Sequence, residues 1–502
     1  MVICFHYNRL FLFKPIFAHL ISSLKYYSRT PTVVRYRAQS KKLITQKIDT
    51  PEYRTLLTPS LLKLAELFKA NKYELRVAGG AVRDILMGIH PHDIDFATTA
   101  TPDQVKRMLI DANIRLINSN GEKHGTITAR IDDKENFEVT TLRVDVITDG
   151  RHAVVEYTQD WQLDASRRDL TINALFLDLE GTVYDYFDGI DDLKYSRIRF
   201  VGDPIERIRE DYLRILRYFR FFGRLANENA SHDKETLEAI RQNANGLRHI
   251  SGERLWVELK RIAEGRNAGP VLKIMLEQDI GQYLGIPSNA DLNQLEDHWR
   301  KCHRAHPHAL TILTKLFRNM DELVKFEQRM KYSNECRRLS QLLVVYRDEI
   351  FLLNSSSIDP LKPYKDLLVD LYLFDPNIKE KIIELLKYQY YLNEIQQLID
   401  WPLPHFPISA GMLALKGIKQ GGNYKIILHE LRQAWKQSNF KATEHQLLEE
   451  TLPIILKNLK TRETLPSNHE KTIVNPPAFA LPKRRKHKES TSDILTTVTS
   501  RK

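Results

Sequence analysis

Two acidic residues separated by one position could hold a metal ion. Asp93 and Asp95 lie in a segment that reads as a strand, where alternate side chains share one face and Ile94 and Phe96 would enter the core. Two carboxylates on one face repel each other unless a cation lies between them. Mg²⁺ prefers carboxylate and phosphate oxygens, and two such ions can hold the attacking and leaving oxygens of an in-line displacement. The pair therefore indicates phosphoryl or nucleotidyl transfer, although alone an Asp-x-Asp is more often a solvated strand end or a turn.

Glu138 is a candidate for the third carboxylate that such chemistry commonly needs. It alternates with Phe137 and Val139, so a strand here would bury the two apolar side chains and turn the acid into a cleft. We expect Glu138 to support the ion that activates the nucleophile.

A pair of glycines makes the phosphate interpretation more specific. Gly79 and Gly80 separate a predicted strand, 73–78, from a predicted helix. Glycine lets backbone N–H groups approach a triphosphate, and a helix N-terminus adds positive potential. The spacing is neither that of a dinucleotide-binding fingerprint nor that of a P-loop. Arg83, one turn into the helix, could bind phosphate or form a salt bridge with Asp84.

The elements that must position these residues form a mixed α/β segment. Helical spacing of apolar residues over 61–68 is followed by strand-like runs at 73–78, 94–96, 125–129, 137–142 and 154–157. After about residue 190 strand signals become rare, and helical periodicity marks 204–228, 234–247, 251–265 and 269–279. We therefore expect an α+β fold in which a small mixed α/β unit precedes an all-helical remainder.

Composition restricts the class of protein. A chain of 502 residues is long enough for two or more packed units. Its three cysteines are widely spaced and match neither a disulfide framework nor a zinc site, which favours a reducing compartment. The net charge of +11 belongs to the two ends, because residues 1–48 hold nine Lys or Arg and no acid, and residues 483–502 hold seven basic and two acidic residues. Nucleic-acid binding must therefore be argued from local patches.

The N-terminal residues 1–48 have the composition of a mitochondrial transit peptide, because they are basic, free of acids and interleaved with apolar and Ser residues. A secretory signal is the alternative, but Lys14-Pro15 interrupts its apolar run. Beyond this segment, no uncharged apolar run reaches the roughly 20 residues of a membrane helix. The basic run 483–488 is either a solvated tail or a nuclear-import signal.

Five motifs in chain order resemble the class II CCA-adding enzymes, a branch of the polymerase β-like nucleotidyltransferases, and the resemblance extends from about residue 60 to 460. Within this family the chain is most similar to the animal mitochondrial and cytosolic form, and 141–160 resembles its flexible loop. The motifs are Gly79–Asp84 with Asp93-x-Asp95, Arg167–Ala174, Asp188–Leu193, Glu210–Arg217 and Ser251–Leu255.

The resemblance implies an enzyme that adds CCA to the 3′ end of tRNA lacking it, using CTP and ATP, two Mg²⁺ ions and no nucleic-acid template. It also implies a domain order: a nucleotidyltransferase head at 56–190, a helical neck at 191–268, a body at 269–400 and a tRNA-binding tail at 401–460. Past about residue 459 the composition turns to Pro, Ser, Thr and Lys, so we expect 461–502 to be a disordered basic end. Either a monomer or a homodimer is compatible with the sequence. We expect a mitochondrial location, with nuclear and cytoplasmic locations left open.

The same resemblance assigns roles inside the head. Asp93 and Asp95 would hold both metal ions, and Glu138 would assist. The residues implied to bind the triphosphate or ribose are Gly80, Arg83, Arg168, Asp169 and Asn173, although a purely structural role for Asp169 fits nearly as well.

Asp211 and Arg214 could read the base of the incoming nucleotide. Three positions apart in a helix, they would lie on one face. A carboxylate only accepts and a guanidinium only donates hydrogen bonds, which matches the amino group and ring nitrogen of cytosine or adenine. The keto oxygens of U and G would leave buried groups unpaired. An exposed helical ion pair is the plainer interpretation, and the two residues do not distinguish C from A.

Arg217 and Arg220 continue the spacing of Arg214 and could contact phosphate, although the stem of Arg220 could equally cover apolar surface. Two other functions stay open: a poly(A) polymerase, whose head motifs are similar, and a catalytically inactive RNA-binding protein with this fold.

Overall fold

The computed structural model describes residues 32–33, 42–117, 125–148, 153–227, 230–348, 359–418, 421 and 423–463. Most of the predicted targeting segment, the basic run 483–488 and nearly all of the predicted disordered end lie outside these residues. The described residues belong to two compact units, the first within Met1–Pro363 and Leu371–Asp400 and the second within Tyr364–Asp370 and Trp401–Lys502.

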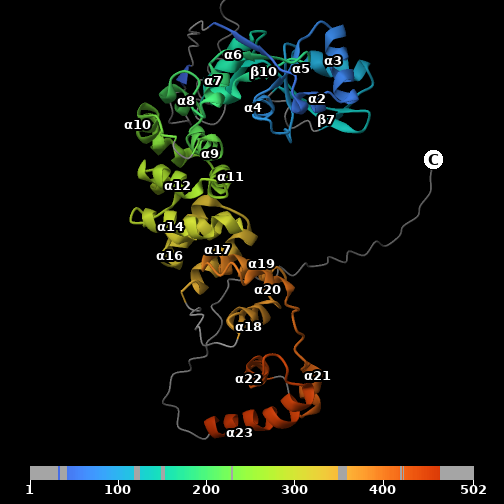
Figure 1. The fold of residues 1–502 in the computed structure, drawn as a ribbon. Helices are drawn as coiled ribbons and strands as arrows, with labels where there is room; N and C mark the ends of the chain where they lie inside the picture. The colour runs from blue at the N-terminus through green and yellow to red at the C-terminus, as the bar shows by residue number, and fades with distance from the viewer. Residues whose placement is uncertain are drawn as a thin grey trace, which may run out of the picture. The chain divides into compact units, whose positions relative to one another are not determined.

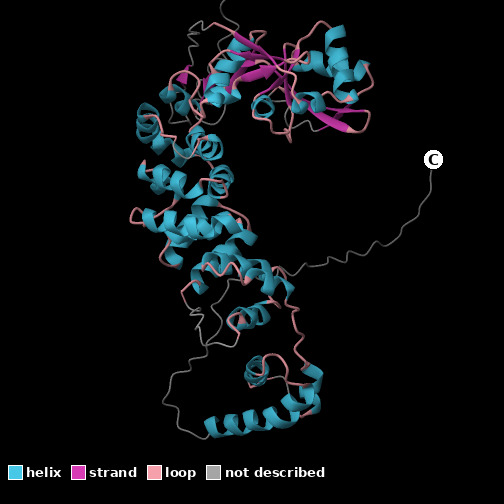
Figure 2. Cartoon of the chain, in the orientation of Figure 1, coloured by secondary structure: helices cyan, strands magenta, loops and turns pink. Residues whose placement is uncertain are grey.

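The first unit begins with the eight-stranded sheet of the head, which is drawn in Figures 1 and 2. Its central strands β3 (Leu75–Ala78) and β4 (Asp95–Thr98) are antiparallel, whereas β4 and β7 (Glu135–Thr141) are parallel. The strand order is β2-β11-β10-β3-β4-β7-β6-β5. The remaining strands are β2 (Ile44–Lys47), β11 (Thr182–Asp185), β10 (Leu175–Leu177), β6 (Thr126–Ile131) and β5 (Arg115–Ile117). Because β2 pairs with β11, the sheet includes the last residues of the segment whose composition indicates targeting.

Short helices cover the sheet. In α3 (Pro59–Ala70), Leu61, Leu64 and Phe68 are fully buried at helical spacing, and Thr58 caps the helix by accepting a hydrogen bond from the Leu61 N–H. The other head helices are α2 (Pro51–Leu56), α4 (Gly80–Leu86), α5 (Pro102–Asp111), α6 (Trp161–Ser166) and α7 (Gly189–Lys194). A separate three-stranded sheet joins β1 (Thr32–Val33), β8 (Arg143–Thr148) and β9 (Ala153–Tyr157).

In the described residues that follow the head, the elements of the first unit are helices. The first of them are α8 (Pro204–Glu210), α9 (Arg214–Leu225), α10 (Lys234–Asn243), α11 (Gly252–Ala263) and α12 (Ala268–Glu277). They are followed by α13 (Gly281–Leu284), α14 (Leu292–Cys302), α15 (Ala309–Leu313), α16 (Met320–Met330), α17 (Asn334–Tyr346), α19 (Ile378–Tyr388) and α20 (Ile395–Asp400). The predicted α+β fold is therefore confirmed.

The second unit has its own apolar core around the fully buried Leu413, Leu431 and Trp435. It contains most of α18 (Lys362–Leu371), together with α21 (Ala410–Leu415), α22 (Tyr424–Gln437) and α23 (Leu452–Glu463). Among the described residues of both units, no helix has the length and apolar character that a membrane span requires.

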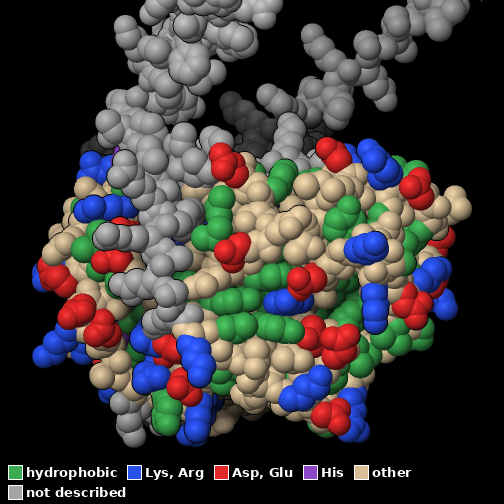
Figure 3. All heavy atoms as spheres, turned by 90° about the horizontal axis from the view of Figure 1, so that it is seen from above, with side chains coloured by type: hydrophobic (Ala, Val, Ile, Leu, Met, Phe, Trp, Pro, Cys, Tyr) green, Lys and Arg blue, Asp and Glu red, His purple; other side chains and the backbone are tan. Residues whose placement is uncertain are grey.

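On the face drawn in Figure 3, basic and acidic side chains are interspersed rather than separated by sign. This agrees with the near balance of charges between the two basic ends of the chain.

Candidate active site

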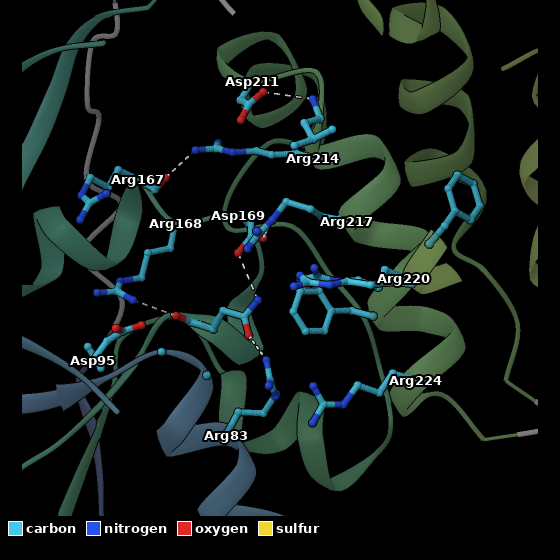
Figure 4. Close-up of a pocket in the computed structure, with 18 of the residues that line it drawn as sticks. Arg83, Asp95, Arg167, Arg168, Asp169, Asp211, Arg214, Arg217, Arg220 and Arg224 are labelled. Carbon is cyan, nitrogen blue, oxygen red and sulfur yellow. Dashed lines mark hydrogen bonds and ion pairs between the residues drawn. The ribbon is translucent and has the colours of Figure 1, made fainter. Parts of the chain in front are cut away.

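A cavity of about 1040 Å³ lies between the sheet and the first helices that follow it (Figure 4). Its wall is contributed by the β3–α4 junction, the start of β4, the second half of β7, the segment 167–173 and the facing sides of α9 and α11. Of the 28 described residues that line it, eleven are arginines and four are acids, namely Asp95, Glu138, Asp169 and Asp211. Such a wall suits a polyanionic ligand.

Gly79 allows an arginine to approach the backbone. It follows β3 with φ +70°, a conformation that favours glycine, and α4 begins at the next residue. A Cβ at Gly79 would lie 2.9 Å from Nη1 of Arg168, so any larger residue at this position would force the guanidinium to move. The predicted strand–glycine–helix junction is confirmed.

Asp95 and Glu138 face the cavity from neighbouring parallel strands. They are register partners in β4 and β7, and both side chains are exposed while Phe137 and Val139 are buried, as the alternation predicted. Although Asp95 is open to the cavity, the surrounding protein partly desolvates its carboxylate, and this desolvation, opposed by Arg168 and reinforced by Asp93, raises the pKa of Asp95. That direction indicates a site in which a cation would stabilise the charged carboxylate.

Asp93 lies elsewhere than the sequence pattern suggested. β4 begins only at Asp95, so Asp93 belongs to the bend before the strand, is exposed, and is not among the residues lining the cavity. The expected alternation with Asp95 along one strand is therefore wrong. Within the described residues, no group of three or more His, Cys, Asp or Glu side chains is arranged to hold a metal ion. Asp95 and Glu138 nevertheless form an oxygen-only pair, which fits Mg²⁺ when substrate phosphates complete the ligands.

Arg168 is held by a carboxylate that the sequence reasoning did not single out. Asp164, whose side chain is 1% exposed, forms ion pairs with Arg168 at 3.0 Å and with Arg167 at 2.7 Å, and accepts a hydrogen bond from the backbone N–H of Arg143. Burial alone would raise the pKa of Asp164, but the two arginines outweigh it and the pKa is lowered. The spacing of four between Asp164 and Arg168 was the available signal.

A chain of hydrogen bonds crosses the floor of the cavity from α4 to α9 (Figure 4). Arg83 Nη1 donates to Asn173 Oδ1 at 2.5 Å, and Asn173 Nδ2 donates to Asp169 Oδ1 at 3.2 Å. Arg217 Nε then donates to Asp169 Oδ2 at 2.6 Å. Burial would raise the pKa of Asp169, but Arg217, with help from Arg214, lowers it to about 2. Arg83 also pairs with Asp84 at 2.9 Å, so its two predicted roles are compatible.

The predicted continuous helix through Asp211 and Arg214 is wrong. α8 ends at Glu210, Asp211 is extended (φ −147°, ψ 106°), and α9 begins at Arg214. The physical cause is local, because the Asp211 carboxylate accepts a hydrogen bond from the Leu213 N–H at 3.1 Å, an alternative to the helical pattern. Both side chains still line the cavity.

Asp211 and Arg214 are held by different partners. Arg254 donates to Asp211 Oδ2 at 2.9 Å. Arg214 donates to Glu210 at 2.6 Å and, through Nη2, to the Arg167 carbonyl at 2.8 Å. The two side chains are thus oriented separately rather than by an ion pair with each other.

Arg220 also lines the cavity. It pairs with the buried Glu258 of α11 at 3.0 Å, and burial lowers its pKa to about 10. Glu258 was not predicted, and Arg254, one turn away on α11, was predicted only as part of the motif Ser251–Leu255, because contacts across about 40 residues leave no local pattern.

Two family models match the chain. Residues 75–199 match the poly(A) polymerase head domain, and residues 232–287 match a model described as a probable RNA and SrmB-binding site of polymerase A.

Relatives match over most of the chain. The mitochondrial CCA tRNA nucleotidyltransferase 1 of Danio rerio is 49% identical over 408 residues, which are 81% of this chain and 94% of that protein. The human protein of the same name is 47% identical over 406 residues, 81% of this chain and 93% of that protein.

Solved structures share the fold. The Bacillus stearothermophilus CCA-adding enzyme in complex with CTP aligns with a TM-score of 0.63 and 23% identity over 83% of this chain and 99% of that chain. The Thermotoga maritima CCA-adding enzyme complexed with tRNA aligns with a TM-score of 0.58 and 19% identity over 83% of this chain and 99% of that chain.

Proposed function

The chain belongs to the CCA tRNA nucleotidyltransferase family, and from that membership we propose that it adds C, C and A to tRNA lacking its 3′ CCA in the cavity described above. The reaction is attack of the tRNA 3′-hydroxyl on the α-phosphate of CTP, twice, and then of ATP, with release of pyrophosphate. The proposal rests on one observation: the same cavity is lined by the carboxylates Asp95 and Glu138, by Arg168, which could bind a triphosphate, and by Asp211 and Arg214.

Catalysis would take place at the end of the cavity that β4 and β7 line with Asp95 and Glu138. A divalent metal ion is general in this family, and we propose Mg²⁺, held by Asp95 with Asp93 and Glu138 in support. When bound, Mg²⁺ would lower the pKa of the attacking hydroxyl and stabilise charge on the phosphate oxygens. Arg168 and the backbone at Gly80 would hold the triphosphate, so that the α-phosphate stays near the carboxylates.

The base would be read without a nucleic-acid template by Asp211 and Arg214. Each oxygen of the Asp211 carboxylate has accepted one hydrogen bond and retains a second lone pair. Arg214 uses Nη1 and one N–H of Nη2 for its protein partners, which leaves donors for a base. Because both side chains are already oriented, selecting C or A over U or G costs little reorganisation.

The remaining assignments follow the domain order expected from the sequence. We propose that the head and neck perform catalysis and base recognition and that the body and tail hold the tRNA, whose duplex is recognised by shape and phosphate contacts. Solved CCA-adding enzymes of this fold are bound to CTP, to tRNA and, in a further structure, to ATP, which supports these substrates. The mitochondrial relatives and residues 1–48 support a mitochondrial location.

A tRNA transcript lacking CCA tests the proposal. Incubated with Mg²⁺ and CTP alone it should gain two nucleotides, and with CTP and ATP three. The poly(A) polymerase description of the head model makes the rival outcome specific. Long A-tails without C incorporation would support that rival and overturn the proposal. If no nucleotide is added, the proposal is also overturned, in favour of an inactive RNA-binding protein.

A further inference from the structure

Three guanidinium groups of the cavity wall converge on one buried ring. Phe221, 4% exposed, has its ring centroid 4.4 Å from Cζ of Arg220, 4.9 Å from Arg83 and 5.9 Å from Arg217. All three distances lie within the range of cation–π attraction. Arg83 comes from α4 of the head, whereas Arg217 and Arg220 share α9 with Phe221. The ring therefore joins arginines from two elements that are far apart in the sequence.

The ring can do what another carboxylate could not. Each arginine already has one acidic partner: Asp84 for Arg83, Asp169 for Arg217 and Glu258 for Arg220. A further carboxylate would occupy more N–H donors and cancel more positive charge. An aromatic face attracts cations through its quadrupole and occupies no N–H donor. It therefore gathers the three guanidiniums while leaving their remaining donors for an anion.

We propose that Phe221 is a positioning residue for the triphosphate: its ring holds Arg83, Arg217 and Arg220 together so that they meet the nucleotide's phosphates as one preorganised cluster. The inference rests on the proposed function. The base-reading side chains Asp211 and Arg214 are held by other partners, so the ring should affect CTP and ATP alike and leave base selection unchanged.

The decisive variant is Phe221→Leu, which keeps an apolar side chain and removes the ring. We expect the KM values for CTP and ATP to rise together by roughly three- to thirtyfold, with kcat and the preference for CTP over UTP nearly unchanged. Inorganic tripolyphosphate, which carries no base, should lose inhibitory strength by the same factor. Phe221→Tyr retains an aromatic face and should restore most of the affinity.

The neighbouring Phe222 provides a matched control on the same helix. It stacks on His232 at 3.5 Å between ring centroids and does not line the cavity. Phe222→Leu therefore loses an equal ring and should leave both KM values and tripolyphosphate inhibition unchanged.

Three results would overturn the inference: unchanged KM values in Phe221→Leu, equal impairment in Phe221→Leu and Phe221→Tyr, or a rise in KM with unaltered tripolyphosphate inhibition. If Phe221→Leu does not fold, as judged by circular dichroism, Phe221→Met replaces it with the same expectations. The wild-type enzyme separates this inference from the proposed function. A wild type that adds CCA and is inhibited by tripolyphosphate, with variants that do not differ from it, removes only the role of Phe221.

Discussion

Replacing Asp169 by Asn should weaken the link between the segment 167–173 and α9 in a pH-dependent way. The Asn side chain keeps an oxygen for the Leu170 N–H and for Asn173 Nδ2, but it loses the ion pair with Arg217. The pKa of Asp169 is lowered from 3.8 to about 2 in the folded protein, despite burial, chiefly by Arg217. At about 1.4 kcal/mol per pH unit, this shift corresponds to about 2 kcal/mol of stability at pH 7.

The sign follows from the direction of the shift. Because the folded-state pKa is depressed, the contribution is complete above about pH 4 and is lost as the pH falls from about 4 to about 2, with about 1 kcal/mol left at pH 3. Urea unfolding followed by tryptophan fluorescence at pH 7, 5 and 3 measures it, since Trp161 packs on Phe176 in the head. Asp133→Asn, at a 77% exposed side chain, is the control and should cost at most about 0.5 kcal/mol.

A stability difference between wild type and Asp169→Asn that stays constant from pH 7 to pH 3 would contradict a role for the Asp169 charge, because a loss that does not titrate is not the loss of a charge. No difference at pH 7 would refute it as well.

Three further substitutions test the catalytic, base-reading and phosphate ends of the cavity. Asp95→Asn should slow single-turnover addition by about 10³-fold or more without loss of fold, and retained activity would contradict its metal role. Asp211→Ala should raise use of UTP relative to CTP by about 10- to 100-fold in competitive incorporation, whereas unchanged selection would assign base reading elsewhere. Gly79→Ala should raise KM for CTP by about tenfold, because its Cβ would displace Arg168. Gly88→Ala has the same positive φ and nothing within 4 Å, so equal effects would mean backbone strain alone.

Local sequence patterns predicted the features that depend on neighbouring residues. The alternation of Phe137, Glu138 and Val139 is a property of one strand, and the structure places those side chains as that period requires. The break at Gly79 is likewise local, because a positive φ between strand and helix favours glycine. The helical half followed from the 3.6-residue period, since its helices bury one face each.

Features that depend on competition between backbone and side chain were misjudged. Asp93 was placed in a strand that begins only two residues later, and Asp211 in a helix that its own carboxylate interrupts. The second error had a readable signal, because Asp often hydrogen-bonds to a backbone N–H two residues ahead and so competes with a helix. Periodicity alone cannot weigh that competition, since both conformations keep the same apolar residues buried.

The acids behind the cavity wall were not predicted as partners of its arginines, and they explain how so many arginines can share one cavity. Asp164, Glu210 and Glu258 are buried and hold Arg168, Arg214 and Arg220 from the side away from the cavity. Without such partners the buried arginines would repel one another at a large cost. With every arginine paired, the cavity would attract a triphosphate only weakly. Positive charge is added at the rim by the exposed Arg261 and Arg266, whereas the exposed Arg224 is itself paired with Asp84 at 3.2 Å. The inner arginines therefore place hydrogen-bond donors in fixed positions for the triphosphate, and the outer arginines supply most of the electrostatic attraction to it.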